Sequence, residues 1–195
     1  MLTLIHSPQS RSTRILWLLE ELGATYDVRY VGIRRMDGSG ARDPANPHPA
    51  GQVPALLHDG AVISESSAIV LYLTDLFPDS EMGRPIGHPE RGAYLTWLAY
   101  YAGVLEPAVT ARQLQIATPG SLFARQFDEL GERLQATLSR HDYLLGDTVS
   151  GADILVSSVM QWSASLMPDL EVLRSHAERM SVRPALARGL QRDAA

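Results

Sequence analysis

Residues 51–68 restrict the fold of this chain more than any other part of the sequence. The dipeptide Asp59-Gly60 stands between two short apolar runs, and this is the strongest short-range signal for a tight β-hairpin. Ser64 is the expected N-cap of a helix whose apolar run is Ala68–Leu73. The segment therefore predicts a β-hairpin that leads directly into a helix.

The same segment carries groups suited to binding a small peptide. Pro54 lacks an N–H, and a cis bond before it would turn the polar groups of Val53 outward, where an extended peptide can pair with them. Glu65 and Ser66 fall at a helix N-terminus, where a carboxylate can hold an ammonium while the hydroxyl and free N–H groups hold a carboxylate. An amino acid head group needs that pair of partners. The alternative is an ordinary hairpin followed by a capped helix.

Taken together, Val53-Pro54, the hairpin and Glu65-Ser66 resemble the cytosolic glutathione transferase superfamily. The resemblance implies that the backbone of Val53 pairs with the cysteinyl part of glutathione. It further implies that Glu65 and Ser66 hold the γ-glutamyl head and that Gln52 lies on the glycine side.

Composition excludes several classes of function. The 195 residues, 45% hydrophobic and 20% charged, describe an ordinary globular protein, and the net charge of −5 argues against nucleic acid as a main partner. We see no signal peptide and no apolar stretch long enough to span a membrane, so a cytoplasmic location is expected. The absence of cysteine excludes disulfides, thiolate–metal sites and protein-thiol redox chemistry. All 17 basic residues are arginine, which excludes a lysine Schiff base.

The order of predicted elements defines the fold class. A strand at 2–6, a loop, a helix at 14–22 and a strand at 26–31 precede the hairpin and its helix. This is the β-α-β, then β-β-α, order of a thioredoxin-like domain. We therefore expect an α/β thioredoxin-like domain at 1–79, a linker at 80–88 and an all-α C-terminal domain at 89–195.

The second half of the chain has helical patterns throughout. A long helix is predicted over 91–117, with a kink or break at Pro107, and another over 121–140. Ser150 and Asp153 have the spacing of a capping box at the start of the next helix. The surrounding run resembles the C-terminal domain signature of the superfamily, so Asp153 is expected to be structural. Pro184 suits the first turn of a last short helix.

Glutathione reacts as a thiolate, and its thiol has a pKa near ~8.5 in solution. Lowering that pKa to about 6.5 takes roughly 2.7 kcal/mol of preferential interaction with the thiolate. A hydroxyl at a helix N-terminus can supply it, and the loop after the first strand is the expected place. We choose Ser10, because Ser10-Arg11-Ser12 resembles bacterial and fungal members of a serine type. Gln9 and Arg11 are the alternatives for the catalytic position, and Ser10 or Ser12 is also the expected N-cap of the first helix.

Other candidate groups depend on less specific patterns. The polar segment 32–50 is either a surface connection or a lid that brings Arg34, Arg35 or His48 near the glycine carboxylate. An acceptor pocket between the domains is expected to be lined from the first long C-domain helix. Its candidates share helical spacing and could equally belong to the core: Trp97, Tyr100 and Tyr101.

The sequence thus predicts a glutathione S-transferase that conjugates glutathione, its co-substrate, to small electrophilic molecules in detoxification. The resemblance implies a homodimer. A glutathione-dependent peroxidase or reductase on the same scaffold is one alternative, and a non-enzymatic scaffold or regulator is the other. No metal site is expected, and we expect none of the six histidines to form a triad with a serine and an acid.

Overall fold

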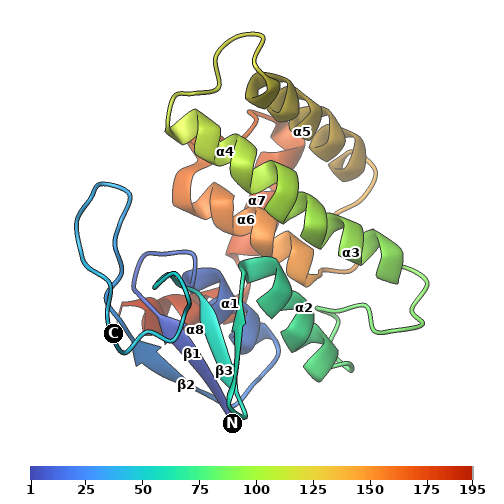
Figure 1. Cartoon of the computed structure of the whole chain (residues 1–195). Coiled ribbons are helices and arrows are strands. Elements are labelled where there is room, and N and C mark those ends of the chain that lie inside the picture. Colours follow the sequence, from blue (N-terminus) through green and yellow to red (C-terminus); the bar gives the residue numbers. More distant parts are fainter. Residues whose placement is uncertain (195) are drawn as a thin grey trace. The chain divides into compact units, whose positions relative to one another are not determined.

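The computed structural model of the chain describes residues 1–194 as two compact units (Figure 1). The first unit is Met1–Phe77 together with the segment that begins at Pro184, and the second is Pro78–Arg183. The last helix thus belongs by packing to the first unit, because it lies against the helix that follows the first strand. The domain boundaries at 1–79, 80–88 and 89–195 were drawn from sequence continuity alone and stay a prediction.

The first unit is built on a four-stranded mixed sheet in the order β2-β1-β3-β4. The strands are β1 (Leu2–His6), β2 (Tyr26–Tyr30), β3 (Ala55–His58) and β4 (Ala61–Ser64). The pair β1–β2 is parallel, while β1–β3 and β3–β4 are antiparallel. The predicted thioredoxin-like arrangement, followed by a helical unit, is confirmed.

Strand β1 is buried on both faces, which agrees with its position inside the sheet. Its alternation sends Leu4 and His6 to one face and Ile5 to the other. Ile5 belongs to a buried cluster with Val31, Val53 and Ala55. The segment around Val53 is therefore packed against the sheet.

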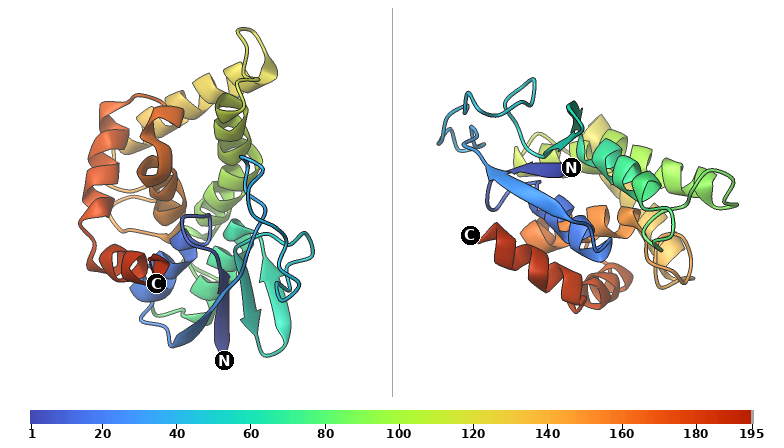
Figure 2. Two further views of the ribbon diagram at one scale, coloured as in Figure 1. Left: turned by 90° about the vertical axis from the view of Figure 1, so that its left-hand side faces the viewer. Right: turned by 90° about the horizontal axis from the view of Figure 1, so that it is seen from below.

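Helix α1 (Thr13–Glu21) is the central helix of this unit, and two other helices pack against it. They are α2 (Ser66–Leu76) and α8 (Pro184–Asp193), and Figure 2 shows α8 beside the sheet-forming part of the chain. Gly23 ends α1 with φ +60°, and its neighbour Ala24 donates to the Leu19 carbonyl at 3.0 Å, as in a helix C-cap motif.

The start of α2 differs from the prediction. Ser64 is not the N-cap, because it is still the last residue of β4 and pairs with Ala55. Glu65 is at the N-cap position with φ +68° and ψ 122°, and its carbonyl accepts from the N–H of Ile69 at 2.9 Å. The change from strand to helix thus takes place at Glu65 alone.

The second unit consists of helices. Within Pro78–Arg183 they are α3 (Arg91–Tyr100), the π-helix η1 (Tyr101–Leu105), α4 (Glu106–Gln113), α5 (Leu122–Leu138), α6 (Gly151–Ser163), the 3₁₀-helix η2 (Ala164–Leu166) and α7 (Glu171–Ser181). The first two turns of α6 are buried at nearly every position, so α6 is the central helix of this unit.

The predicted break near Pro107 is confirmed in a specific form. A π-helical turn over Tyr101–Leu105 separates α3 from α4, and Pro107 follows in the first turn of α4. Because proline cannot donate to the preceding turn and its ring crowds the carbonyl there, the wider turn relieves both conflicts.

The capping box of α6 is also confirmed. The N–H and the hydroxyl of Ser150 lie 2.9 and 2.7 Å from Asp153 Oδ2, and both side chains are buried. Asp153 Oδ1 accepts from the N–H of Leu144 at 2.8 Å. Asp153 therefore connects the preceding loop to the helix, as a structural residue would. Among residues 1–194, no helix has the length and apolar character needed to cross a membrane.

Candidate functional site

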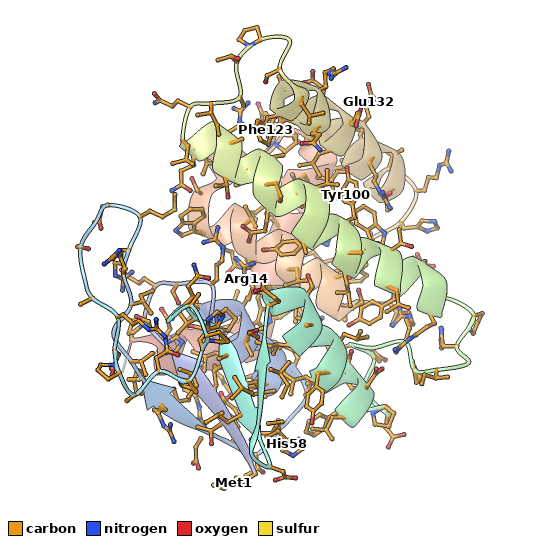
Figure 3. The ribbon with its side chains drawn as sticks, viewed as in Figure 1. Met1, Arg14, His58, Tyr100, Phe123 and Glu132 are labelled. Carbon is orange, nitrogen blue, oxygen red and sulfur yellow. The ribbon has the colours of Figure 1, made fainter. Side chains whose placement is uncertain are left out.

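One end of the sheet brings the predicted binding residues together. The register pairs Ile5 with Ala55 and Ala55 with Ser64. The loop after β1, the residues before β3 and the start of α2 therefore all leave the sheet at the same end. Figure 3 shows Arg14, in the first turn of α1, at this end of the unit, and Met1 and His58 at the opposite end.

Val53 lies just beyond the last rung of the β1–β3 ladder, and its peptide bond to Pro54 is cis. The side chain of Val53 is buried in the cluster with Ile5, Val31 and Ala55. This packing fixes the position of the Val53 backbone. Gln52 is exposed, and its carbonyl accepts from the Asn46 side-chain amide at 3.0 Å. Asn46 is buried and was not predicted to matter. Sequence reasoning placed it in an irregular segment, where periodicity gives no signal.

Glu65 and Ser66 stand at the N-terminus of α2, as predicted. Glu65 is exposed, and within residues 1–194 its carboxylate makes no hydrogen bond or ion pair. Ser66 is half-buried in the first turn of the helix, close to N–H groups that have no partner within the helix. A free carboxylate beside a hydroxyl and a helix N-terminus can bind an amino acid head group.

The Ser7–Ser12 loop folds around a chain of hydroxyl contacts. Ser10 Oγ lies 2.6 Å from the carbonyl of Ser7 and 2.7 Å from Ser12 Oγ. Ser12 occupies the N-cap position of α1, but its hydroxyl does not cap the helix. Instead, Ser12 Oγ lies 2.7 Å from Nδ1 of His6 and accepts from the N–H of Ser7 at 3.2 Å.

His6 was not predicted as a site residue. It is fully buried at the end of β1, and its Nε2 lies 3.4 Å from Asp193 Oδ1 of α8. Asp193 also accepts from the Thr13 hydroxyl and from the N–H of Gln9. Burial lowers the pKa of His6 from its ordinary value, and the Asp193 carboxylate opposes that effect. The ring edge of Tyr30 is its aromatic neighbour, at 5.5 Å between centroids.

Two buried histidines lie against both a serine and an acid in the fold, although no triad arrangement was recognisable in the sequence. His6 contacts Ser12 and Asp193, and in the second unit the buried His176 contacts Ser157 Oγ at 3.3 Å and Asp153 Oδ1 at 2.9 Å. Neither set has a sequence signature, because its members come from different helices and strands. No group of three or more His, Asp or Glu side chains in the described part of the chain could hold a metal ion.

The two alternatives to Ser10, Gln9 and Arg11, lie in the same loop and have exposed side chains. Gln9 has φ +53° and donates its N–H to Asp193. In this loop, Ser10 is the hydroxyl that is both partly accessible and connected to a buried basic group.

The segment 32–50 is attached to the loop after β1. Arg35 is exposed and donates to the carbonyls of Pro8 at 2.9 Å and Gln9 at 3.4 Å. His48 is buried, and its Nδ1 accepts from the N–H of Ala50 at 3.0 Å. Of the three predicted lid residues, Arg34 and Arg35 are thus exposed, whereas His48 supports the backbone near Val53.

The aromatic candidates lie in the second unit. Trp97 is buried and Tyr100 half-buried, and the guanidinium of Arg133 lies over both rings, at 4.5 and 4.0 Å from their centroids. Figure 3 shows Tyr100 on the same side of the unit as α5, which carries Arg133. Tyr101 is buried, and its hydroxyl donates to Glu106. Tyr100 is the most accessible of the three.

Known proteins share this fold. The family model described as "Glutathione S-transferase, N-terminal domain" matches residues 7–76, and "Glutathione S-transferase, C-terminal domain" matches residues 123–184. Fold and site together define a thioredoxin-like, glutathione-binding class of protein.

Individual relatives extend over the whole chain. A glutathione transferase structure from Methylococcus capsulatus is 30% identical with a TM-score of 0.77, covering 100% of this chain and 99% of that one. A sphingomonad glutathione S-transferase complexed with glutathione is 26% identical with a TM-score of 0.79, covering 98% of each chain. Glutathione S-transferase GstA of Escherichia coli O157:H7 is 28% identical over 93% of each chain. The chain belongs to the glutathione S-transferase family.

Proposed function

We propose that this protein transfers glutathione to small electrophilic molecules, with Ser10 activating the thiol. The observation that carries the proposal is the meeting of three structures at one end of the sheet: the backbone of Val53, the Glu65-Ser66 start of α2 and the hydroxyl-rich loop after β1. Each matches one part of glutathione, namely its peptide backbone, its amino acid head and its sulfur.

The binding roles follow from the chemistry of each group. Glu65 pairs with the ammonium of the γ-glutamyl head, and Ser66 with the N-terminal N–H groups of α2 binds its carboxylate. The backbone of Val53 and the neighbouring Pro54 receive the cysteinyl part as an added strand. Gln52 lies on the glycine side. The partners proposed for this site are glutathione and a small electrophile. Trp97, Tyr100 and Tyr101 of the second unit stay sequence-based candidates for contact with the acceptor.

The sulfur is proposed to lie beside Ser10, whose hydroxyl donates a hydrogen bond to the thiolate. The first turn of α1 adds the positive end of the helix dipole. Together they favour the ionised sulfur, which then attacks the electrophile and becomes bonded to carbon as the leaving group departs.

Two other functions share the same contacts. A glutathione-dependent peroxidase or reductase differs only in the acceptor, and a non-enzymatic regulator would keep the fold without turnover. A homodimer and a cytoplasmic location stay predictions from the family resemblance and the sequence. The presence of the free Glu65 carboxylate favours a protein that binds glutathione.

The proposal is tested by replacing Glu65 with Gln and measuring glutathione affinity by calorimetry. Loss of the carboxylate that pairs with the ammonium should weaken binding at least about 30-fold, since breaking a charge pair in a binding site costs about 2 kcal/mol or more. Asp59→Asn is the matched control, because it removes the same charge from an exposed acid of the hairpin turn between β3 and β4. Equal affinity of Glu65→Gln and wild type would refute the proposed site.

A further inference from the structure

The buried pair His6–Asp193 has no role in the function proposed so far. His6 is 0% exposed, yet it is connected to the partly accessible Ser10 by one intermediate hydroxyl. The contacts form a continuous line: Ser10 Oγ to Ser12 Oγ is 2.7 Å, Ser12 Oγ to His6 Nδ1 is 2.7 Å, and His6 Nε2 to Asp193 Oδ1 is 3.4 Å. Such a line joins a surface hydroxyl to a base inside the protein.

We propose that His6, supported by Asp193, accepts the proton of the glutathione thiol through the hydroxyls of Ser12 and Ser10. The inference rests on the proposed function, since it requires the sulfur to lie beside Ser10. It adds two positioning residues, His6 and Asp193, which act through the serine hydroxyls and do not touch the sulfur.

The proton transfer balances without any further reactant. The S–H bond breaks and its proton binds Ser10 Oγ, while the proton of Ser10 moves to Ser12 Oγ and that of Ser12 moves to His6 Nδ1. The products are a thiolate and an imidazolium, and each hydroxyl has exchanged one proton for another. The proton returns through the same hydroxyls after the thiolate has been consumed, and leaves with the leaving group or to water.

The surroundings of His6 suit an acceptor of this kind. Burial lowers the pKa of His6, which favours a neutral ring with a free lone pair, and the Asp193 carboxylate opposes that effect and so favours proton uptake. When the Ser12 hydroxyl donates to Nδ1 rather than to the Ser7 carbonyl at 3.3 Å, the neutral ring carries its proton on Nε2. Within residues 1–194, Nε2 is buried without a hydrogen-bond partner and lies 3.4 Å from Asp193 Oδ1. The carboxylate then stabilises the imidazolium, and it is fixed by the Thr13 hydroxyl and the N–H of Gln9. Tyr30 is a further titratable side chain against the ring.

The same contacts could serve only to stabilise the loop. In that arrangement, Ser10 donates permanently to the Ser7 carbonyl at 2.6 Å, and no proton passes to Ser12. The two possibilities differ in one measurable respect. Only the relay changes the protonation state of His6 when glutathione ionises.

The direct test is NMR of the protein labelled with ¹⁵N-histidine, with His6 assigned by comparison with His6→Asn. On saturation with glutathione at neutral pH, the two ring nitrogens of His6 should shift to imidazolium positions. S-methylglutathione, which binds through the same groups but has no thiol proton, should leave His6 neutral. A neutral His6 in the presence of bound glutathione thiolate would overturn the relay and leave the proposed function intact. Absence of any bound thiolate in the wild type would overturn both.

Kinetics provide an independent test. His6→Asn keeps a polar side chain but cannot take up a proton, so kcat at neutral pH should fall about tenfold or more while KM changes less than about twofold. The profile of kcat against pH should move to higher pH. Asp193→Asn should move the profile of kcat against pH in the same direction. This variant provides the test if His6→Asn does not fold. His58→Asn is the matched control, because His58, the last residue of β3, is half-buried and its Nδ1 lies 2.7 Å from the Tyr72 hydroxyl of α2. Normal kcat in both His6→Asn and Asp193→Asn, alongside a slow Ser10→Ala, would contradict the relay.

Discussion

The hydroxyl proton of Ser10 has two acceptors in the free protein, the Ser7 carbonyl at 2.6 Å and Ser12 Oγ at 2.7 Å. A thiolate beside it would be a third acceptor and the only charged one, and hydrogen bonds to charged groups are the stronger ones. The N–H of Ser12 also approaches Ser10 Oγ, at 3.2 Å, which holds the oxygen in place while its proton reorients. The oxygen of Ser10 is therefore fixed in position, while its proton can be donated to more than one acceptor.

Replacing Ser10 with Ala should lower kcat about 100-fold while glutathione affinity stays within about twofold of wild type. The reason is that the hydroxyl interacts with the ionised sulfur and adds little to binding of the peptide. Steady-state kinetics with an electrophilic substrate and calorimetric titration with glutathione measure the two quantities. Unchanged turnover would mean that another group activates the sulfur.

Gly189 of α8 lies close against the backbone of α1. A Cβ placed there would lie 3.1 Å from Trp17 N and 3.2 Å from its Cα, and both are backbone atoms that cannot move aside cheaply. Gly189→Ala should therefore lower the free energy of unfolding by about 1–3 kcal/mol despite the better helix propensity of alanine.

The control is Gly131→Ala within α5, where the nearest atom to the new Cβ is a Pro168 side-chain carbon at 3.6 Å. This substitution should be neutral or stabilising by up to about 1 kcal/mol. Urea unfolding of the two variants measures the difference. Equal stability of Gly189→Ala and Gly131→Ala would show that the two helices are not packed as described.

At the scale of elements, α8 is held against the first unit by charges as well as by apolar packing. Glu20 of α1 binds Arg188 Nε at 2.9 Å, lies 3.3 Å from Arg192 Nε and accepts from the Tyr26 hydroxyl at 2.7 Å. Because Asp193 lies at the end of α8, this docking also sets the distance between Asp193 and His6. The attachment of the last helix is thus part of the candidate site.

The ion pairs of Glu20 predict a pH-dependent contribution to stability. Burial raises the pKa of Glu20, but hydrogen bonds from Tyr26 and Arg188 and the charge of Arg192 outweigh it, so the pKa is lower than the ordinary 4.5. A lowered pKa in the folded state gives stability that is present above about pH 4.5 and is lost as the pH falls through the folded value.

Glu20→Gln should therefore cost about 1 kcal/mol at pH 7, with the difference from wild type shrinking as the pH falls below 4.5. Urea unfolding at a series of pH values measures it. Glu132→Gln, which neutralises an exposed acid on α5, should show no such pattern (Figure 3). A constant difference at every pH would argue that Glu20 acts by packing alone.

At the scale of the whole molecule, the features that the sequence predicts correctly are those that depend on residues close together in the chain. The hairpin at Asp59-Gly60, the capping box at Ser150 and the break near Pro107 all follow from local chemistry, and all three are present. The N-cap expected at Ser64 was wrong because β-pairing with β3 extended through that residue. Tertiary pairing overrode a local preference.

The residues that sequence reasoning missed are those whose partners lie far along the chain. His6 and Asp193 stand near opposite ends of the sequence and meet because α8 returns to the first unit. A single histidine in a strand carries no periodicity or spacing that would reveal this partner. Asn46 is similar, since its role depends on the fold of an irregular segment. Long-range polar contacts of this kind need the structure.

The central claim is that this protein binds glutathione and ionises its thiol, and one titration tests it directly. Ultraviolet absorbance of the thiolate is followed against pH for glutathione mixed with the purified protein. The account predicts a saturable thiolate signal that appears well below the pKa of about 8.5 of a free thiol. Absence of this signal at glutathione concentrations on the order of millimolar, with the protein folded, would contradict the claim.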